Sequence, residues 1–200
     1  MQLPAALCQV SPMLDDGEAD LVERAKRDPQ AFSVLYRRHY SAMAGYVFRR
    51  TGDVHLTEDL VADVFLTAMR FLPRYRQRGA PFRAWLYRIA TTSVNRWARR
   101  NRRMTEETAR RLEARRDGDR SPVGHVGHAD AANCDAELAR LALLSLSPKH
   151  QAVLSLHYLE GLSVDEVAET IDCRVGTVKS RLSRGRNALR ERLLRGRYKL

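Results

Sequence analysis

The segment 163–193 gathers side chains that could recognise another molecule through hydrogen bonds and charge. Ser163 and Glu166 have the S-x-x-E spacing of a capping box, which predicts that a short helix begins there. The apolar period then breaks at a turn containing Gly176, which permits a tight backbone bend. A second helix is expected from about Val175, and the pattern as a whole is typical of a helix-turn-helix.

The second helix of this motif has three distinct faces. At about 100° per residue its apolar side falls on one narrow arc, made by Val178, Leu182, Gly185, Leu189 and Leu193. The opposite arc carries Ser180, Ser183, Arg184 and Asn187, and the flanks carry Lys179, Arg181 and Arg186. A helix in a DNA major groove needs polar groups toward base edges, cations beside both phosphate strands and an apolar back. Residues 174–200 hold ten Lys or Arg and one acid, so an ordinary solvated helix is the weaker interpretation.

The composition agrees with a nucleic-acid partner. The chain has 200 residues and a formal net charge of +11, and no run approaches the roughly 20 apolar residues of a membrane span. The N-terminus lacks the basic start of a signal peptide. Cys8, Cys134 and Cys173 are odd in number and far apart, which predicts no disulfide framework and a cytoplasmic location.

Charge alternates in blocks that predict the domain organisation. Residues 51–69 contain acids and no Lys or Arg, whereas 70–103 contain eleven arginines and no acid. A polar stretch at 104–136 reads as a flexible linker, and 150–173 is again acidic before the basic C-terminal region. We therefore predict an all-α fold of two small helical domains, at 17–103 and 137–200, after a flexible extension at 1–16.

The first domain shows several helix boundaries. Asp28 followed by proline predicts a helix start, and Gly52 a stop. Either Asp53 or Thr57 could cap the next helix, which Pro73 ends. Along residues 82–103, four aromatic residues alternate with seven arginines, a combination that favours a surface stacking on unpaired bases and holding their phosphates.

Two long segments together resemble one known family. The first segment comprises the stretches AFSVLYRRHY, TGDVHLTEDLVADVFLTAMRFLPRYR and FRAWLYRIATTSVNRWARR, and it resembles sigma domain two. The second segment is LLSLSPKHQAVLSLHYLEGLSVDEVAETIDCRVGTVKSRLSRGRNALRERL, and it resembles sigma domain four. The chain is thus similar to the extracytoplasmic-function (ECF) sigma factors of the sigma-70 family. The resemblance implies a polymerase subunit with no enzyme activity of its own. Domain two would grip the β′ clamp helices and melt and read the −10 element, and domain four would bind the β flap and read the −35 element.

The resemblance also assigns roles to residues. Core polymerase binding is implied for Glu58, Asp59, Leu60, Asp63 and Phe65. Contact with −10 DNA is implied for Tyr75, Arg76, Arg78, Phe82, Trp85, Arg88, Thr92, Asn95, Arg96 and Arg99. The implied −35 set is Arg174, Thr177, Lys179, Ser180, Arg181, Ser183, Arg184 and Arg186. Many relatives carry Asn in place of Thr92 and Asp in place of Asn95, so the resemblance does not transfer the detailed recognition of the −10 bases to this chain.

Other function classes fit less well. A transcriptional regulator with a LuxR-like helix-turn-helix would share the C-terminal motif but would give the basic, aromatic segment 70–103 no role. No phosphate-binding glycine loop or H-E-x-x-H motif is present, and His125 with His128 and Cys134 lacks a second ligand pair, so we expect no metal or cofactor. The expected partners are core polymerase, promoter DNA and an anti-sigma factor, with no insertion into a membrane.

Overall fold

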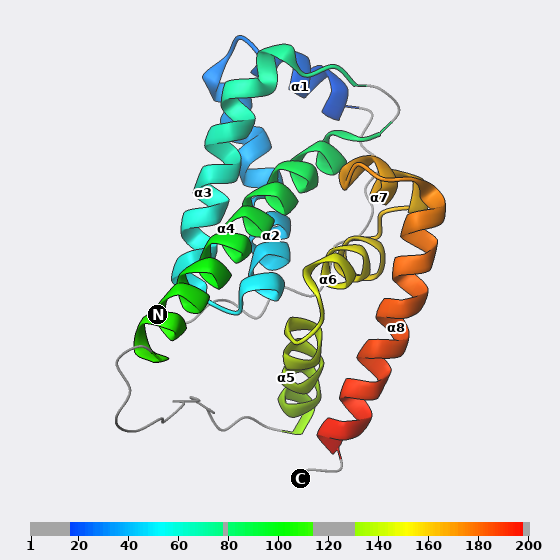
Figure 1. Cartoon of the computed structure of the whole chain (residues 1–200). Coiled ribbons are helices and arrows are strands. Elements are labelled where there is room, and N and C mark those ends of the chain that lie inside the picture. The colour runs from blue at the N-terminus through cyan, green and yellow to red at the C-terminus, as the bar shows by residue number, and fades with distance from the viewer. Residues whose placement is uncertain (1–16, 78–79, 114–130, 198–200) are drawn as a thin grey trace.

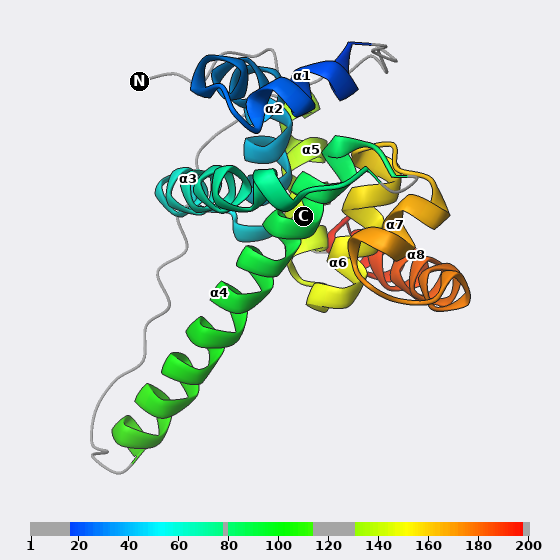
Figure 2. The ribbon, with the colours of Figure 1, turned by 90° about the horizontal axis from the view of Figure 1, so that it is seen from above.

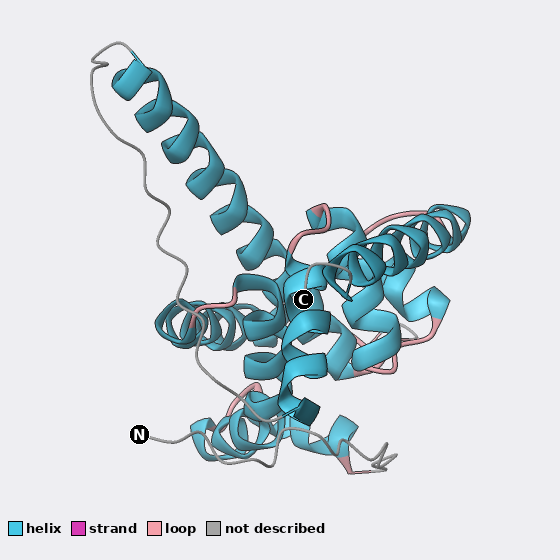
Figure 3. Ribbon diagram, turned by 90° about the horizontal axis from the view of Figure 1, so that it is seen from below, coloured by secondary structure: helices cyan, strands magenta, loops and turns pink. Residues whose placement is uncertain are grey.

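The computed structural model describes residues 17–77, 80–113 and 131–197, which fold into helices joined by short loops and contain no strand (Figure 3). The elements in chain order are α1 Glu18–Ala25, α2 Pro29–Thr51, α3 Val54–Phe71, the 3₁₀ turn η1 Leu72–Arg74, α4 Phe82–Glu113, α5 Ala131–Leu144, α6 Pro148–Leu154, the π-helical turn η2 Ser155–Leu159, α7 Val164–Thr170 and α8 Val175–Arg197. The predicted all-α class is confirmed. Among the described residues, no helix has both the length and the apolar character needed to cross a bilayer.

The long helices of the first domain begin and end at the predicted signals. The side chain of Asp28 accepts a hydrogen bond of 2.8 Å from the backbone N–H of Gln30, which caps α2. Gly52 ends α2 at a φ of 73°, a left-handed conformation that glycine adopts without strain. Of the two predicted caps of α3, Asp53 is the one that serves, because its carboxylate accepts from the N–H of Leu56 at 2.9 Å.

Helices α2, α3 and α4 pack around one aliphatic core, with α1 laid across α2 (Figure 1). The most deeply buried side chains of this core include Leu35, Met43, Tyr46, Val61, Val64, Leu86, Ala90 and Val94. The C-terminal half of α4 projects beyond the other helices (Figure 2). Helical structure also extends into both ends of the predicted 104–136 linker. Residues 104–113 are rich in strong helix formers, which explains why α4 continues to Glu113. The predicted extension at 1–16 and the histidines at 125 and 128 lie outside the described residues.

The second domain contains the helix-turn-helix at the predicted place. The capping box is present: the hydroxyl of Ser163 accepts from the N–H of Glu166 at 3.2 Å, and the Glu166 carboxylate accepts from the N–H of Ser163 at 2.7 Å. The turn differs from expectation in one respect. Its left-handed residue is Asp172, at a φ of 51°, whereas Gly176 is already the second residue of α8. A short polar side chain tolerates this conformation better than most, so no glycine is needed.

The apolar arc predicted for α8 is the side that packs against its own domain. Val178 and Leu182 are buried, and Leu189 packs partly against the core. Gly185 lies on the same arc, at a point where α6 comes close. A Cβ at this position would meet the side chain of Leu154 at 3.3 Å, which favours glycine there. The rotation of α8 about its axis is therefore as predicted, and its basic face points away from the domain.

Candidate functional site

The outward face of α3 carries the predicted acids. Glu58, Asp59 and Asp63 are all exposed on this face. Leu60 and Phe65, predicted to bind polymerase with them, are instead 8% and 5% exposed. These two side chains belong to the core, because α2 covers that side of α3.

Phe65 shows how this burial arises. Its ring centroid lies 4.6 Å from that of Tyr36 on α2, and the two rings are tilted by 59°. An aromatic pair at this distance stabilises the α2–α3 packing. In this structure Phe65 therefore orients the helix that carries the acids and does not present its own ring to a partner.

Two apolar residues on α3 take the exposed positions that sequence reasoning missed. Leu66 is 58% exposed and Met69 is 50% exposed. Leu66 follows Asp63 by three residues and Asp59 by seven, which keeps it on their face of the helix. Met69 follows Leu66 by three residues and extends the exposed apolar surface at the edge of that face. Exposed apolar side chains beside acids are typical of a binding surface. The helical spacing from the acids was the signal that could have identified them.

The basic surface of α4 is a stripe along one face of the helix. Arg88, Thr92, Arg96 and Arg99 are all exposed and follow one another at spacings of four, four and three residues. The hydroxyl of Thr92 donates to the backbone carbonyl of Arg88 at 2.9 Å. Asn95 lies at the edge of the stripe, half-buried, where its side-chain oxygen accepts from the Arg50 guanidinium at 2.8 Å.

The predicted aromatic surface is mostly part of the core. Tyr75 and Phe82 are 9% and 3% exposed, and with the half-buried Trp85 they form a cluster of rings with centroids 4.7 to 5.5 Å apart. Burial, followed by the charges of Glu18 and Glu23, raises the pKa of the Tyr75 phenol to about 12. The cluster ties η1 to the start of α4, so the connecting segment is anchored at both ends. Arg76 is exposed on that segment, and Arg78 lies outside the described residues.

The basic face of α8 has the predicted composition and exposure. Exposed side chains on and beside this face are Arg174, Lys179, Ser183, Arg184 and Arg186, with Thr177, Ser180 and Arg181 half-buried. The hydroxyl of Ser180 donates to the carbonyl of Thr177 at 3.0 Å, which leaves its lone pairs available. The Arg181 guanidinium reaches back toward the sulfur of Cys173 at 3.9 Å.

The two domains are in contact, which the sequence did not indicate. The carboxylate of Glu160, between η2 and α7, forms an ion pair with Arg49 of α2 and accepts a hydrogen bond from the Tyr87 hydroxyl of α4 at 2.5 Å. The Glu160 side chain is only 4% exposed. Burial and the Glu160 charge both raise the pKa of the Tyr87 phenol.

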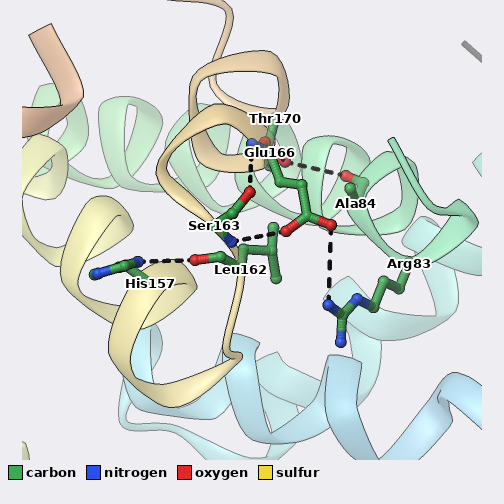
Figure 4. Close-up of polar contacts among 7 residues, drawn as sticks. All are labelled: Arg83, Ala84, His157, Leu162, Ser163, Glu166 and Thr170. Carbon is green, nitrogen blue, oxygen red and sulfur yellow. Dashed lines mark hydrogen bonds and ion pairs between the residues drawn. The ribbon is translucent and has the colours of Figure 1, made fainter. Parts of the chain in front are cut away.

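Further contacts between the domains join α7 to the start of α4 (Figure 4). The hydroxyl of Thr170 on α7 donates to the carbonyl of Ala84 on α4 at 3.4 Å. The Arg83 guanidinium lies 3.9 Å from the Glu166 carboxylate, which also serves in the capping box. His157 does not take part in this contact: its ring bonds to the carbonyl of Leu162 within its own domain, at 2.8 Å.

Comparison with known families matches both halves of the chain in this order. Residues 35–104 match the model of Sigma-70 region 2, and residues 136–189 match that of Sigma-70, region 4. The first match spans α3 and the basic stripe of α4, and the second contains the helix-turn-helix. A helical protein with these two regions is a sigma-70-type chain.

Curated relatives narrow the class. The chain is 33% identical to the ECF RNA polymerase sigma-E factor of Escherichia coli over 176 residues, which covers 84% of this chain and 90% of the relative. It is also 33% identical to the ECF RNA polymerase sigma factor SigE of Mycolicibacterium smegmatis over 165 residues, which covers 80% of this chain and 60% of the relative. The chain therefore belongs to the ECF family of RNA polymerase sigma factors.

Solved structures share the fold. The sigma factor RpoE of Bartonella quintana, in complex with the anti-sigma factor NepR, aligns with a TM-score of 0.62 at 23% identity over 81% of this chain and 96% of the other. CnrH in complex with the cytosolic domain of CnrY aligns with a TM-score of 0.63 at 24% identity, over 88% and 96%.

Proposed function

We propose that this chain binds core RNA polymerase through the outward face of α3 and directs promoter-specific initiation. The observation that carries the proposal is the presence, on one chain, of an acidic and apolar docking face and two separate exposed basic helices. Because the chain belongs to the ECF family, we interpret this combination as a polymerase-binding face together with two DNA-binding helices. Core polymerase supplies the catalysis and the chain supplies promoter choice, so its own contribution is binding energy.

The polymerase contact is assigned to the exposed residues of α3. Acids there complement a basic surface, which speeds association and selects the partner, while the apolar Leu66 and Met69 supply the desolvated centre that carries most of the affinity at an interface. We assign the β′ clamp helices to this face, and the β flap to the second domain.

Promoter reading is assigned to the two basic helices. Arg184 and Ser183 of α8 lie opposite the buried Val178 and Leu182. We therefore assign them to the base edges of the −35 element, and Lys179 and Arg186 to its phosphates. The stripe of α4 is assigned to the −10 strand. Since Tyr75 and Phe82 are buried, Trp85 and the arginines of the stripe are the better-placed of the predicted −10 residues in this conformation.

A LuxR-like regulator is the rejected alternative, because it would leave the Sigma-70 region 2 match and the docking face of α3 without a role. Because core polymerase acts in the cytoplasm, we infer the same location for this chain. An anti-sigma factor is a proposed partner, supported by the similar structure of the sigma factor RpoE, which is in complex with the anti-sigma factor NepR.

Run-off transcription tests the proposed function. Core polymerase is mixed with this chain and a template from the region upstream of its own gene. Core plus the chain should give a discrete transcript that core alone does not. If the transcript appears only when another sigma factor is added, the chain acts as a regulator and the proposal is wrong.

A further inference from the structure

A buried arginine lies behind the basic stripe of α4. Helices α2 and α4 pack side by side in the first domain (Figure 1). Arg50, near the end of α2, is only 4% exposed. A charged side chain is buried to this extent only where acceptors satisfy its donors. The groups that accept its hydrogen bonds therefore indicate what this buried charge does.

A hydrogen-bond network inside the core holds the Arg50 guanidinium in place. The guanidinium donates to the Tyr46 hydroxyl at 2.9 Å and lies 5.6 Å from the centroid of the same ring. The Tyr46 hydroxyl is in turn 2.6 Å from the hydroxyl of Thr91 on α4. Tyr46 is fully buried and Thr91 is 4% exposed. The network thus joins α2 to α4 and fixes the position of the guanidinium between them.

The same guanidinium reaches a side chain at the edge of the basic stripe. Its Nη2 donates to the Asn95 side-chain oxygen at 2.8 Å and has a longer contact of 3.4 Å with the carbonyl of Pro148. Asn95 follows Thr92 by three residues and precedes Arg99 by four, so it lies beside these exposed residues on one side of α4. Asn95 is half-buried. It therefore lies between the buried guanidinium and the proposed DNA surface.

The chemistry of arginine sets the orientation of the Asn95 amide. A guanidinium carries donors and no acceptor, so it can bond only to the oxygen end of an amide. The NH2 end of Asn95 then lies on the side away from Arg50. An asparagine without such a partner could turn either end toward a base. With Arg50 behind it, Asn95 offers its donor end.

We propose that Arg50 is a positioning residue for promoter reading. By holding the Asn95 oxygen, it makes Asn95 favour guanine or thymine at one position of the −10 element. The inference rests on the proposed function, which assigns the −10 strand to this face of α4. Guanine and thymine present an exocyclic acceptor oxygen, whereas adenine and cytosine present an amino donor. A contact made by a donor therefore discriminates between the two pairs of bases.

Base selection by the holoenzyme tests the proposal. Core polymerase with the full chain transcribes a library in which the −10 element is randomised and each template carries a transcribed barcode. The unaltered chain should favour guanine or thymine about fivefold or more at one position. Asn95→Ala should abolish the preference at that position and leave the others unchanged. If Asn95→Ala leaves every preference intact, Asn95 reads no base and the proposal is wrong.

Substitutions of Arg50 separate positioning from stability. Arg50→Met removes the donors, so the Asn95 amide can turn either way and the preference should fall below about twofold. Arg50→Lys keeps a group that only donates and should retain most of the preference. Val47→Ala, at a fully buried position of α2, is the control and should lower stability without changing the base ranking.

Three results with these variants would overturn the proposal. Arg50→Met could lower transcription from all templates alike with the base ranking intact, which would make Arg50 a structural residue only. Equal loss of the preference in Arg50→Met and Arg50→Lys would assign the effect to packing. A change of the same base preference in Val47→Ala would assign it to loss of stability.

Asn95→Asp should give the opposite preference. A carboxylate only accepts, so one oxygen can keep the bond from Arg50 while the other faces the base, and the preference should invert to adenine or cytosine. This variant keeps the partner of Arg50, so it decides the question if Arg50→Met loses helicity by circular dichroism. Retention of guanine or thymine by Asn95→Asp would contradict the proposal. A preference of the unaltered chain for adenine would also contradict it, because asparagine pairs with adenine through both ends of its amide.

A measurement on the free chain keeps this inference separate from the proposed function. Urea denaturation of Arg50→Met, Asn95→Ala and the double variant gives the coupling between the two side chains. The double variant should lose less stability than the sum of the two single losses. Additive losses would overturn the positioning role. If the unaltered holoenzyme starts at no promoter, the proposed function fails, and the coupling between Arg50 and Asn95 stands.

Discussion

The Tyr87 hydroxyl of α4 donates a hydrogen bond of 2.5 Å to the Glu160 carboxylate just before the helix-turn-helix. The same helix carries Arg88 and Thr92 on an exposed face. Helix α4 therefore uses one face to dock the second domain and another for the proposed contact with DNA.

Charge reversal on α3 should weaken polymerase binding without unfolding the chain. Glu58→Lys with Asp59→Lys places two cations on an exposed face, where single charges contribute about 0–1 kcal/mol to stability but like charges across an interface cost several kcal/mol. Co-purification with core polymerase measures the effect. Asp20→Lys on α1 is the control. Retention of core binding by the double variant would reduce these acids to a solvated face.

Leu66 and Met69 should behave differently from Leu60 and Phe65. Truncating either exposed residue to alanine should change the unfolding free energy by less than about 0.5 kcal/mol yet lower affinity for core by about 1–2 kcal/mol. Truncating either buried residue should destabilise the chain by about 2–5 kcal/mol. Chemical denaturation and core-binding titrations on the four variants compare the two quantities. The reverse pattern would show that α3 docks through its buried side after rearrangement.

The arrangement of side chains on α8 predicts that residues that contact base edges can be distinguished from residues that contact phosphates. Arg184→Ala should cost about 1–3 kcal/mol and relax preference at one or two base pairs of the −35 element. Lys179→Ala or Arg186→Ala should weaken all sequences alike and lower the salt dependence by about one counterion. Selection of −35 variants with each mutant holoenzyme distinguishes them. A changed preference for Lys179→Ala, with none for Arg184→Ala, would mean that α8 is rotated on the DNA relative to this assignment.

Tyr75 predicts a loss of stability at alkaline pH. Its pKa rises from 10.0 to about 12 on folding, so the unfolded chain releases the phenolic proton first. The contribution of the neutral Tyr75 phenol to the free energy of unfolding is fully present below about pH 10 and is lost as pH rises toward 12. Urea denaturation across that range should show a shallower decline for Tyr75→Phe than for the unaltered chain. Identical slopes would place the Tyr75 hydroxyl in water.

Local features could be predicted from the sequence because they depend on neighbours along the chain. The caps at Asp28 and Ser163 and the apolar arc of α8 are of this kind. What could not be predicted depends on neighbours in space. Helical spacing places Phe65 on the buried side of α3, but it does not say that Tyr36 of α2 covers it. Glu160 is buried because a second domain docks there. A periodicity argument identifies the face of a helix, but it does not say which other helix will cover that face.

The measurement that bears most directly on the central claim is transcription from templates in which the −35 and −10 elements are scrambled separately. Core polymerase with this chain should start at one position on the intact template, and scrambling either element should abolish that start. Restoring both elements should restore it without any other sigma factor. Specific initiation that survives loss of either element, or that needs a second sigma factor, would contradict a role for this chain as the promoter-reading subunit.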